Sequence, residues 1–465
     1  MRPLMVLGCT SSAGKSLLVT ALARSFARRG VDVVPFKAQN MSNNARVVDG
    51  GEIGVAQWLQ ARAAGVEPDV RMNPVLLKPE ADTRSQVVVD GVARPDLTAM
   101  PWLDRGPHLW PAMTEAFDRL RRDHQLVIIE GAGSPAEINL PDLVNNRLLA
   151  HADAAALLVA DIDRGGAFAH VYGTWALVPA PTRQRLAGYV LNRFRGDAGL
   201  LQPGPTQLTA RTGMAHAGTL PMLHHELPDE EGVTIRAVPP GPARHVAVVG
   251  YPYASNLDEL HLLSHVANVR VARHPADLTG ADLVVLPGSK HVAADVAWLR
   301  CTGLAVATHN HATAGRQLLG VCGGAMMLGH RIHDPTGVEG AAEGLGLLAF
   351  DTVMHPTKLT RPTTVRFSDL SAPWATLNGL AVTGYEIRNG RLTVAGDGDT
   401  DDRVRVVADD NVLATTVHGL LEDPAVLAAL FGTAPGPVLD ATFDHLADAV
   451  DTHLDRDLLD RLVRS

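Results

Sequence analysis

Short, continuous apolar runs recur along the first half of the chain and alternate with segments of helical periodicity. Runs without polar interruptions are typical of strands that are buried on both faces of a parallel sheet. They lie at residues 5–8, 126–129, 155–160 and 188–191, and at residues 31–36 with Asp32 as a polar exception. The segments between them place apolar side chains three to four residues apart, as Leu18, Leu22 and Phe26 do. This alternation predicts a parallel α/β domain over residues 1–226.

A second series of strands begins after a proline-rich stretch. Residues 227–244 contain four prolines and predict a linker. The strand pattern then resumes, which predicts a second α/β domain over residues 245–438. Residues 439–465 predict an amphipathic helical tail packed against the body, and the acidic stretch 396–402 predicts an exposed turn. The clearest apolar strands of the second domain are at residues 245–250, 282–286 and 318–321.

Length, charge and cysteine content narrow the class of protein. A chain of 465 residues exceeds one ordinary core, which agrees with two domains. The net charge of −9, with scattered basic residues, argues against nucleic-acid binding. The cysteines Cys9, Cys301 and Cys322 fit neither a disulfide framework nor a zinc site and indicate a reducing compartment. No export signal is visible, and the apolar run 154–160 is too short for a membrane span, so we expect a cytoplasmic protein without a membrane partner.

Residues 318–329 read LLGVCGGAMMLG and have the pattern of a nucleophile elbow. An apolar strand would end at Cys322 and a helix would begin directly behind it, which places the thiol on a tight turn. Glycines suit such a turn because it is strained and because substrate must approach the backbone closely. The helix N-terminus favours thiolate over thiol, and its N–H groups can stabilise an oxyanion. The alternative is a buried structural cysteine in a glycine-rich turn.

Residues 8–16 read GCTSSAGKS between a predicted strand and a predicted helix. This context predicts a phosphate-binding loop, in which successive N–H groups surround the phosphates. Lys15 would add positive charge at the terminal phosphates, and the Ser16 hydroxyl can ligate Mg²⁺. Five residues separate Gly8 from Gly14, and Cys9 stands where a glycine is usual. The side chain of Cys9 need not prevent binding, because the backbone makes the contacts.

Polar residues also follow the other predicted strands of the first domain. The segment 37–44 is rich in Asn and is expected to meet a carboxylate substrate at the edge of the sheet, although a solvated turn is the alternative. Glu130 follows a buried strand and is expected to ligate Mg²⁺. Asp161 and Asp163 follow the next strand, and capping of the next helix is favoured over metal binding for them.

The two glycine-rich regions resemble two known families. Cys322 with its glycines, the Pro-Gly-Ser turn at residues 287–289 and the Val-His-Gly at residues 417–419 together resemble the class I glutamine amidotransferase domain, which has a flavodoxin-like fold. The loop at residues 8–16, with Glu-Gly-Ala-Gly at residues 130–133, resembles the dethiobiotin-synthetase-like phosphate-loop proteins.

Both regions in this order make the chain similar to the enzymes that amidate cobyrinic acid. Residues 35–42 and 73–79 resemble the cobyric acid synthase family rather than the related a,c-diamide synthases. The resemblance implies four amidations, at the b, d, e and g carboxylates of adenosylcobyrinic acid a,c-diamide, with ATP, Mg²⁺ and glutamine and in cobalamin biosynthesis. It leaves a homo-oligomer open and gives no nucleic-acid partner.

The resemblance also implies a role for particular residues. These are catalysis by Cys322 and His418; an oxyanion site at Gly288, Ser289 and Gly323; nucleotide binding by Gly8, Ser11, Ser12, Gly14, Lys15, Ser16 and Asn192; substrate binding by Lys37, Gln39 and Asn40; and Mg²⁺ ligation by Ser16 and Glu130.

Two positions depart from the pattern of the amidotransferases. A glutamate commonly stands two residues after the catalytic histidine, but here that residue is Leu420. A Cys322–His418 dyad is therefore expected rather than a triad, with Glu422 as a weaker third candidate. Arg388 stands where the family usually has a histidine.

Two other functions remain open at this stage. A nucleotide-switched adaptor would use the phosphate loop alone and would leave the Cys322 region without a purpose. A cobyrinic acid a,c-diamide synthase, or an amidotransferase acting on another polycarboxylate, would use both regions.

Overall fold

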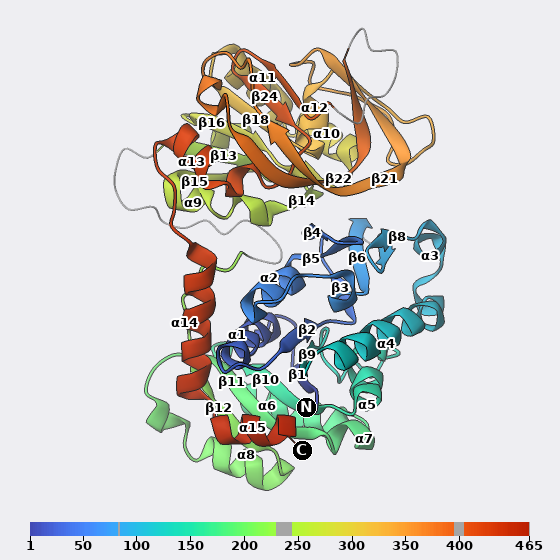
Figure 1. Ribbon diagram of the computed structural model, residues 1–465, viewed down its shortest axis with the longest axis vertical. Helices are drawn as coiled ribbons and strands as arrows, with labels where there is room; N and C mark the ends of the chain where they lie inside the picture. Colours follow the sequence, from blue (N-terminus) through green and yellow to red (C-terminus); the bar gives the residue numbers. More distant parts are fainter. Residues whose placement is uncertain (82–83, 229–243, 395–403, 465) are drawn as a thin grey trace.

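A parallel six-stranded sheet forms the centre of the first of two bodies, which are stacked along the long axis of the molecule (Figure 1). The computed structural model describes residues 1–81, 84–228, 244–394 and 404–464. Each strand predicted from the continuous apolar runs is present, and the central strand is buried along its whole length. The strand order is β12 (Ala215–Pro221), β11 (Leu186–Phe194), β10 (Ala155–Asp161), β1 (Leu4–Gly8), β9 (Leu126–Glu130) and β2 (Val33–Phe36).

Helices cover both faces of this sheet. On one face, α1 packs Leu18, Leu22 and Phe26 into the core, as their spacing predicts. On the other face, Phe117 of α4 meets Phe36 edge to face, with ring centroids 5.5 Å apart. The helices are α1 (Lys15–Arg28), α2 (Val55–Ala64), α3 (Pro95–Ala99), α4 (Gly106–Asp123), α5 (Leu148–Ala152), α6 (Ala167–Leu177), α7 (Ala180–Arg183) and α8 (Gly204–Thr212).

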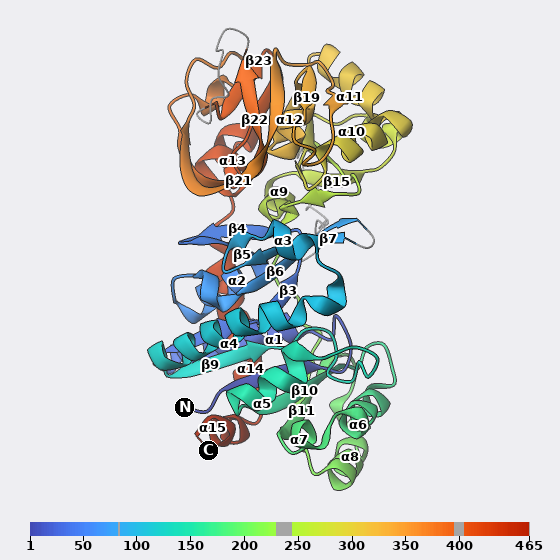
Figure 2. The same ribbon diagram turned by 90° about the vertical axis from the view of Figure 1, so that its right-hand side faces the viewer.

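Two small sheets extend the first body toward the second (Figure 2). One consists of β3 (Gln39–Met41), β6 (Val75–Ala81), β7 (Arg84–Val89) and β8 (Val92–Ala93). The other is a hairpin of β4 (Ala45–Val48) and β5 (Gly51–Gly54). The hairpin was not predicted, and α2 begins only at Val55 because Gly51–Gly54 is occupied by the second strand of the hairpin.

The C-terminal tail returns to the first body, and both termini lie there (Figure 1). It forms α14 (Val438–His453) and α15 (Arg456–Arg464). Helix α14 packs against α1, where Phe443 and Leu446 share a core with Leu18 and Leu22. Arg24 of α1 adds an ion pair with Asp444 at 2.8 Å. The tail is therefore an integral layer of the first body, as its amphipathic pattern suggests.

The second body is built on another six-stranded sheet. Its order is β15 (Asn268–Ala272), β13 (His245–Val249), β16 (Leu283–Leu286), β18 (Gln317–Val321), β24 (Val412–Thr415) and β23 (Val406–Asp409). Counted along the chain, the five parallel strands follow the order 2-1-3-4-5 of flavodoxin-like folds, and antiparallel β23 adds an edge. This confirms the expected fold class. The helices are α9 (Leu263–Val266), α10 (Val292–Cys301), α11 (Leu304–Thr313), α12 (Gly323–Leu328) and α13 (Pro424–Phe431).

A long antiparallel pair beside this sheet was not predicted. Strands β21 (Phe350–Arg366) and β22 (Ala381–Val394) pair along most of their length, with β19 (Arg331–His333) and β20 (Ala342–Glu343) at one edge. A short pair, β14 (Ala254–Ser255) and β17 (Gly288–Ser289), lies near the first body. Most of the predicted linker 227–244 and all of the predicted acidic turn 396–402 lie outside the described residues.

Candidate active sites in the two bodies

Cys322 occupies the strained turn that its glycine-rich surroundings predict. It follows β18 directly, precedes α12, and has φ 51° and ψ −107°, a conformation that non-glycine residues rarely adopt. Its backbone N–H donates to the carbonyl of Thr415 at 2.7 Å, which ties the turn to the neighbouring strand β24. The thiol is 4% exposed, and its Sγ lies 3.6 Å from the carbonyl oxygen of Ile387. Strain at an ordered, buried thiol fits a nucleophile elbow.

The glycines after Cys322 are required by close packing. A Cβ on Gly324 would lie 2.0 Å from the carbonyl oxygen of Leu286, and a Cβ on Gly323 would lie 2.6 Å from the backbone nitrogen of Ser289. These contacts bring Gly323 and Ser289 together, while Gly288 lies next to the His418 ring. The three residues expected to form the oxyanion site thus lie around Cys322 and His418.

His418 is oriented by a glutamate that sequence reasoning missed. The ring Nδ1 lies 2.9 Å from Glu259 Oε1, and the other carboxylate oxygen accepts from the backbone N–H of Gly419 at 2.7 Å. Glu259 lies in the short helix η5 (Leu257–Leu260), and both side chains are 1% exposed. The imidazole also stacks on Tyr385, with centroids 5.2 Å apart and 19° between the planes. Glu259 therefore makes the contact to the imidazole that the third member of a catalytic triad would make, which adds a candidate to the expected Cys322–His418 dyad.

The pKa of His418 reflects this arrangement. Burial alone would lower it, but the Glu259 carboxylate and Cys322 reverse the effect and raise the pKa to about 10. The imidazole is therefore held in its charged form at neutral pH beside the Glu259 carboxylate. In that state it can return a proton to departing ammonia.

Glu422, the weaker candidate for the third member, has a different partner. Its carboxylate makes a bidentate pair with Arg46 of the first body, 2.6 Å from Nη1 and in contact with Nη2. Glu422 lies in the short helix η8 (Leu420–Glu422), directly after the turn that holds His418. Spacing from His418 was therefore a poor guide to the acid, because the acid comes from another segment.

Glu259→Gln should reduce glutaminase activity by at least about tenfold, because proton donation by the imidazole is worth about a hundred- to ten-thousand-fold and depends on ring orientation. Loss of the carboxylate should also lower the pKa of His418 and move the alkaline limb of the kcat/KM profile to lower pH. Glu422→Gln is the matched control, with a loss of about tenfold or less expected. Glutamate release across pH measures both, and equal losses in the two variants would contradict the assignment.

The phosphate-binding loop has the geometry that its sequence predicts. It joins β1 to α1, and Gly14, the residue directly before the helix, has φ 98°. A Cβ on Gly14 would lie 2.0 Å from Asn192 Nδ2, which donates to the carbonyl of Ala13 at 3.0 Å. Asn192 therefore stabilises the loop through this hydrogen bond and through its contact with Gly14. Gly8 is also tightly packed, because a Cβ there would lie 2.8 Å from Lys15 Nζ.

The Glu130 carboxylate, at the end of β9, accepts hydrogen bonds from three side chains. Its carboxylate accepts from Ser16 Oγ at 2.9 Å, from Lys37 Nζ at 2.7 Å and from Gln60 Nε2 at 2.5 Å. Burial would raise the pKa of Glu130, but the Lys37 ammonium and its hydrogen bond lower it below the ordinary value. An ionised carboxylate beside a serine hydroxyl is a hard oxygen donor set, so these residues fit Mg²⁺.

One cavity of about 1200 Å³ contains most of the predicted nucleotide and substrate residues. It opens at the carboxyl edge of the first sheet, where parallel α/β folds bind ligands. Lys37 contacts Glu130 within it, and Asn40 donates to Gln57 at 3.0 Å. The predicted residues that line it are Ser11, Ser12, Gly14, Lys15, Ser16, Lys37, Gln39, Asn40, Glu130 and Asn192.

The structure gives the surroundings of three residues whose roles the sequence did not decide. Burial raises the pKa of the Cys9 thiol to about 11, so it is unsuited to act as a nucleophile. Asp161 pairs with Arg193 at 2.9 Å, and α6 begins at Ala167 after Gly166 without a side-chain cap, so the prediction that Asp161 or Asp163 caps this helix is wrong. Arg388 is buried and pairs with Glu386 at 2.8 Å.

A second group of side chains able to hold a metal lies between the bodies. Glu226, His261 and His265 bring their ligand atoms within 4.8 Å of one another, and His265 Nε2 is 3.2 Å from Glu226 Oε2. Each residue also has another interaction partner in the chain. Imidazole donors suit Zn²⁺ better than Mg²⁺, so this group differs in chemistry from the Ser16–Glu130 pair.

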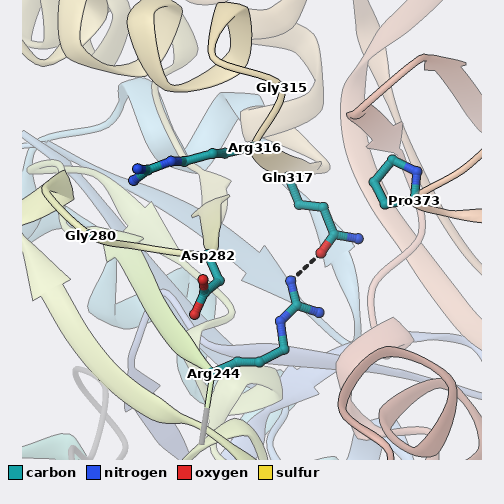
Figure 3. Close-up of a pocket in the computed structure, with 7 residues that line it drawn as sticks. All are labelled: Arg244, Gly280, Asp282, Gly315, Arg316, Gln317 and Pro373. Carbon is teal, nitrogen blue, oxygen red and sulfur yellow. Dashed lines mark hydrogen bonds between the residues drawn. The ribbon is translucent and has the colours of Figure 1, made fainter. Parts of the chain in front are cut away.

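A smaller pocket of about 600 Å³ in the second body lies at the end of the sheet opposite Cys322 (Figure 3). Gln317, the first residue of β18, accepts a hydrogen bond from Arg244, and Asp282 immediately precedes β16. These positions mark the amino ends of the strands, whereas Cys322 lies beyond their carboxyl ends.

Comparison with known protein families gives one match for each body. Residues 4–234 match the family described as "CobQ/CobB/MinD/ParA nucleotide binding domain", and residues 245–426 match "CobB/CobQ-like glutamine amidotransferase domain". Among solved structures, a glutamine amidotransferase covers 44% of this chain and 98% of its own, with 18% identity and a TM-score of 0.28. In the described part of the chain, no helix has the length and apolar character to cross a membrane.

Curated relatives match over nearly the full length. Cobyric acid synthase of Variovorax paradoxus (strain S110) is 54% identical over 476 residues, covering 99% of each chain. Cobyric acid synthase of Paracidovorax citrulli (strain AAC00-1) is 53% identical and covers 98% of this chain and 97% of its own. With this identity over both bodies, the chain belongs to the cobyric acid synthase family, glutamine-hydrolysing ligases of cobalamin biosynthesis that use a nucleotide.

Proposed function

We propose that this chain amidates the b, d, e and g carboxylates of adenosylcobyrinic acid a,c-diamide, using ATP and ammonia released from glutamine at Cys322. One observation carries the proposal: a phosphate loop with candidate carboxylate-binding residues lines one cavity, and a buried Cys–His–Glu triad lies in the other body. A carboxylate is a poor acyl donor, so an enzyme that amidates it needs both an activating and a nitrogen-releasing site.

Activation takes place in the cavity of the first body. The loop N–H groups and Lys15 bind the phosphates of ATP and stabilise negative charge as the terminal phosphoryl group moves to the substrate carboxylate. Lys37, Gln39 and Asn40 orient that carboxylate. The product is an acyl phosphate, from which ammonia displaces inorganic phosphate to give the amide.

Ser16 and Glu130 would hold Mg²⁺, which supplies charge neutralisation at the phosphates when bound. Lys37 and Gln60 keep Glu130 ionised and fixed in place for this purpose. Gly14 and Asn192 hold the loop in its binding conformation.

Nitrogen release takes place at the triad. The Cys322 thiolate attacks the side-chain amide of glutamine, the N–H groups around Gly288, Ser289 and Gly323 stabilise the oxyanion, and His418 gives a proton to ammonia. Water then hydrolyses the thioester to glutamate. Glu259 holds the imidazole throughout.

Mass spectrometry tests the substrate. We expect four carboxyl-to-amide conversions when the protein is incubated with adenosylcobyrinic acid a,c-diamide, ATP, Mg²⁺ and glutamine, each lowering the mass by about one dalton. Cobyrinic acid without amides is the comparison substrate. Conversion of its a and c carboxylates, with none of the b, d, e and g groups, would identify an a,c-diamide synthase instead.

A further inference from the structure

Arg46 of the first body reaches into the second body beside the proposed glutaminase triad. Arg46 lies on β4, in the hairpin that faces the second body (Figures 1 and 2). Its guanidinium is 6% exposed and contacts Asp258 and Glu422, which belong to η5 and η8. Asp258 immediately precedes Glu259, and Glu422 lies three residues after Gly419, whose N–H donates to Glu259, so both contacts end close to hydrogen bonds of the triad.

The guanidinium also contacts the aromatic layer that supports the catalytic imidazole. Arg46 Cζ lies 5.4 Å from the Tyr385 ring centroid and 5.0 Å from that of Trp58. Tyr385 stacks on His418 and pairs with its backbone in both directions, at 3.2 and 2.9 Å. A stack of guanidinium, phenol and imidazole therefore crosses the interface between the bodies.

The positive charge of Arg46 compensates a group of acidic side chains beside the triad. Asp258, Glu259 and Glu422 bring three carboxyl groups together, and Asp258 is fully buried. Burial raises the pKa of Asp258, and Arg46 opposes this shift. Without the guanidinium, Asp258 would be a buried carboxylate that lacks its cation, and it would take up a proton or move toward water. Either response would displace η5, which carries Glu259.

Neighbouring contacts fix the hairpin against η5. Asn256 Nδ2 donates to the carbonyl of Ala45 at 2.7 Å and to the Tyr385 hydroxyl at 3.1 Å. The backbone N–H of Leu257 donates to Asn44 Oδ1 at 3.2 Å. The segment that presents Glu259 is thus attached on one side to the first body and on the other to the catalytic histidine.

We infer that Arg46 is a positioning residue for glutamine hydrolysis, by which the amide-forming body completes the glutaminase triad of the other body. The inference rests on the proposed glutaminase role of Cys322. It gives the hairpin β4–β5 a function that its sequence did not reveal.

The test measures glutamate release and ammonia-dependent amidation in the full chain. Arg46→Met keeps much of the side-chain volume without the charge and should lower kcat for glutamine hydrolysis at least tenfold, with KM for glutamine within about twofold. Removing the buried guanidinium should raise the pKa of the acidic groups near it. The acid limb of the kcat/KM profile should therefore move to higher pH. Ammonia-dependent amidation should stay within about twofold, which shows that the variant is folded.

Arg46→Lys should be intermediate, because an ammonium cannot make the bidentate pair.

Lys358→Met is the matched control. Lys358 also crosses the interface, where it pairs with buried Glu52, but Glu52 retains Lys78 as a second partner. We expect glutamine hydrolysis within about twofold of the unmodified protein. Equal losses in Arg46→Met and Lys358→Met would show general loosening of the interface and overturn the inference.

A double variant distinguishes positioning of the triad from a separate effect. If Arg46 acts through Glu259 and His418, Arg46→Met should cost much less in the Glu259→Gln background than in the unmodified chain. Full additivity, or normal glutamine hydrolysis in Arg46→Met alone, would overturn the inference and leave the proposed function intact. Absence of glutaminase activity in the unmodified chain would overturn both.

Discussion

Replacement of Cys322 by alanine or serine is expected to abolish glutamine-dependent synthesis while ammonia-dependent synthesis continues. The Cys322 sulfur is the proposed nucleophile that forms a covalent bond to glutamine. Loss of a nucleophile from a triad typically lowers the catalytic rate on the order of ten-thousand-fold or more. Ammonia supplied at high concentration and raised pH bypasses this step, because the acyl phosphate forms in the other body. Amide formation from each nitrogen source, with ATP and the diamide substrate, measures the effect.

The serine variant is the more informative of the two. Cys322 has a positive φ and sits against Gly323, so its conformation must be retained for a fair comparison. Serine differs from cysteine by one atom and keeps the backbone demands of the turn unchanged. If a folded Cys322→Ser protein loses ammonia-dependent synthesis as well, Cys322 serves more than nitrogen release.

The sheet cores could be predicted because their strands are buried on both faces. Strands β1, β9 and β10 are continuous apolar runs, and parallel strands are read from such runs more easily than antiparallel ones. Strand β21 shows the opposite case, since residues 355–364 are exposed or only partly buried and no continuous apolar run marks the strand. The predicted boundaries at 226, 244 and 438 remain predictions.

Glycine-rich turns were equally informative, because their chemistry is local. The loop before Lys15 and the turn around Cys322 each depend on neighbours in sequence, and both have the expected strand–turn–helix context. His418 depends on a contact that is not local. Strand β24 ends at Thr415, and an isolated bridge to Tyr385 holds the histidine beyond it.

Glu259 and Arg46 could not be predicted, because their roles depend on contacts between distant segments. Glu259 precedes His418 by 159 residues, and its only local signal is an adjacent pair of acids after a strand. Arg46 meets its partners 212 and 376 residues later in the chain. Both are buried charges that are stable only when paired, which the sequence of one segment cannot show.

Lys15→Ala should abolish synthesis from glutamine and from ammonia alike, which is the opposite selectivity to Cys322→Ser. Lys15 begins α1 and its Nζ donates to the carbonyl of Gly133 at 3.1 Å, so its charge is held at the mouth of the phosphate loop. Removing a cation that stabilises transferring phosphate typically costs about a hundred- to thousandfold in rate. ADP formation and amide formation should fall together, because no acyl phosphate forms.

Arg24→Ala provides the control for the helix that carries Lys15. Arg24 lies on the same helix, pairs with Asp444 of the C-terminal tail and has no place in the cavity. It should leave both activities within about twofold, since a partly exposed ion pair contributes about 1 kcal/mol or less. If Lys15→Ala instead keeps near-normal ammonia-dependent activity, the loop is structural, and the phosphoryl transfer assigned to this cavity must occur elsewhere.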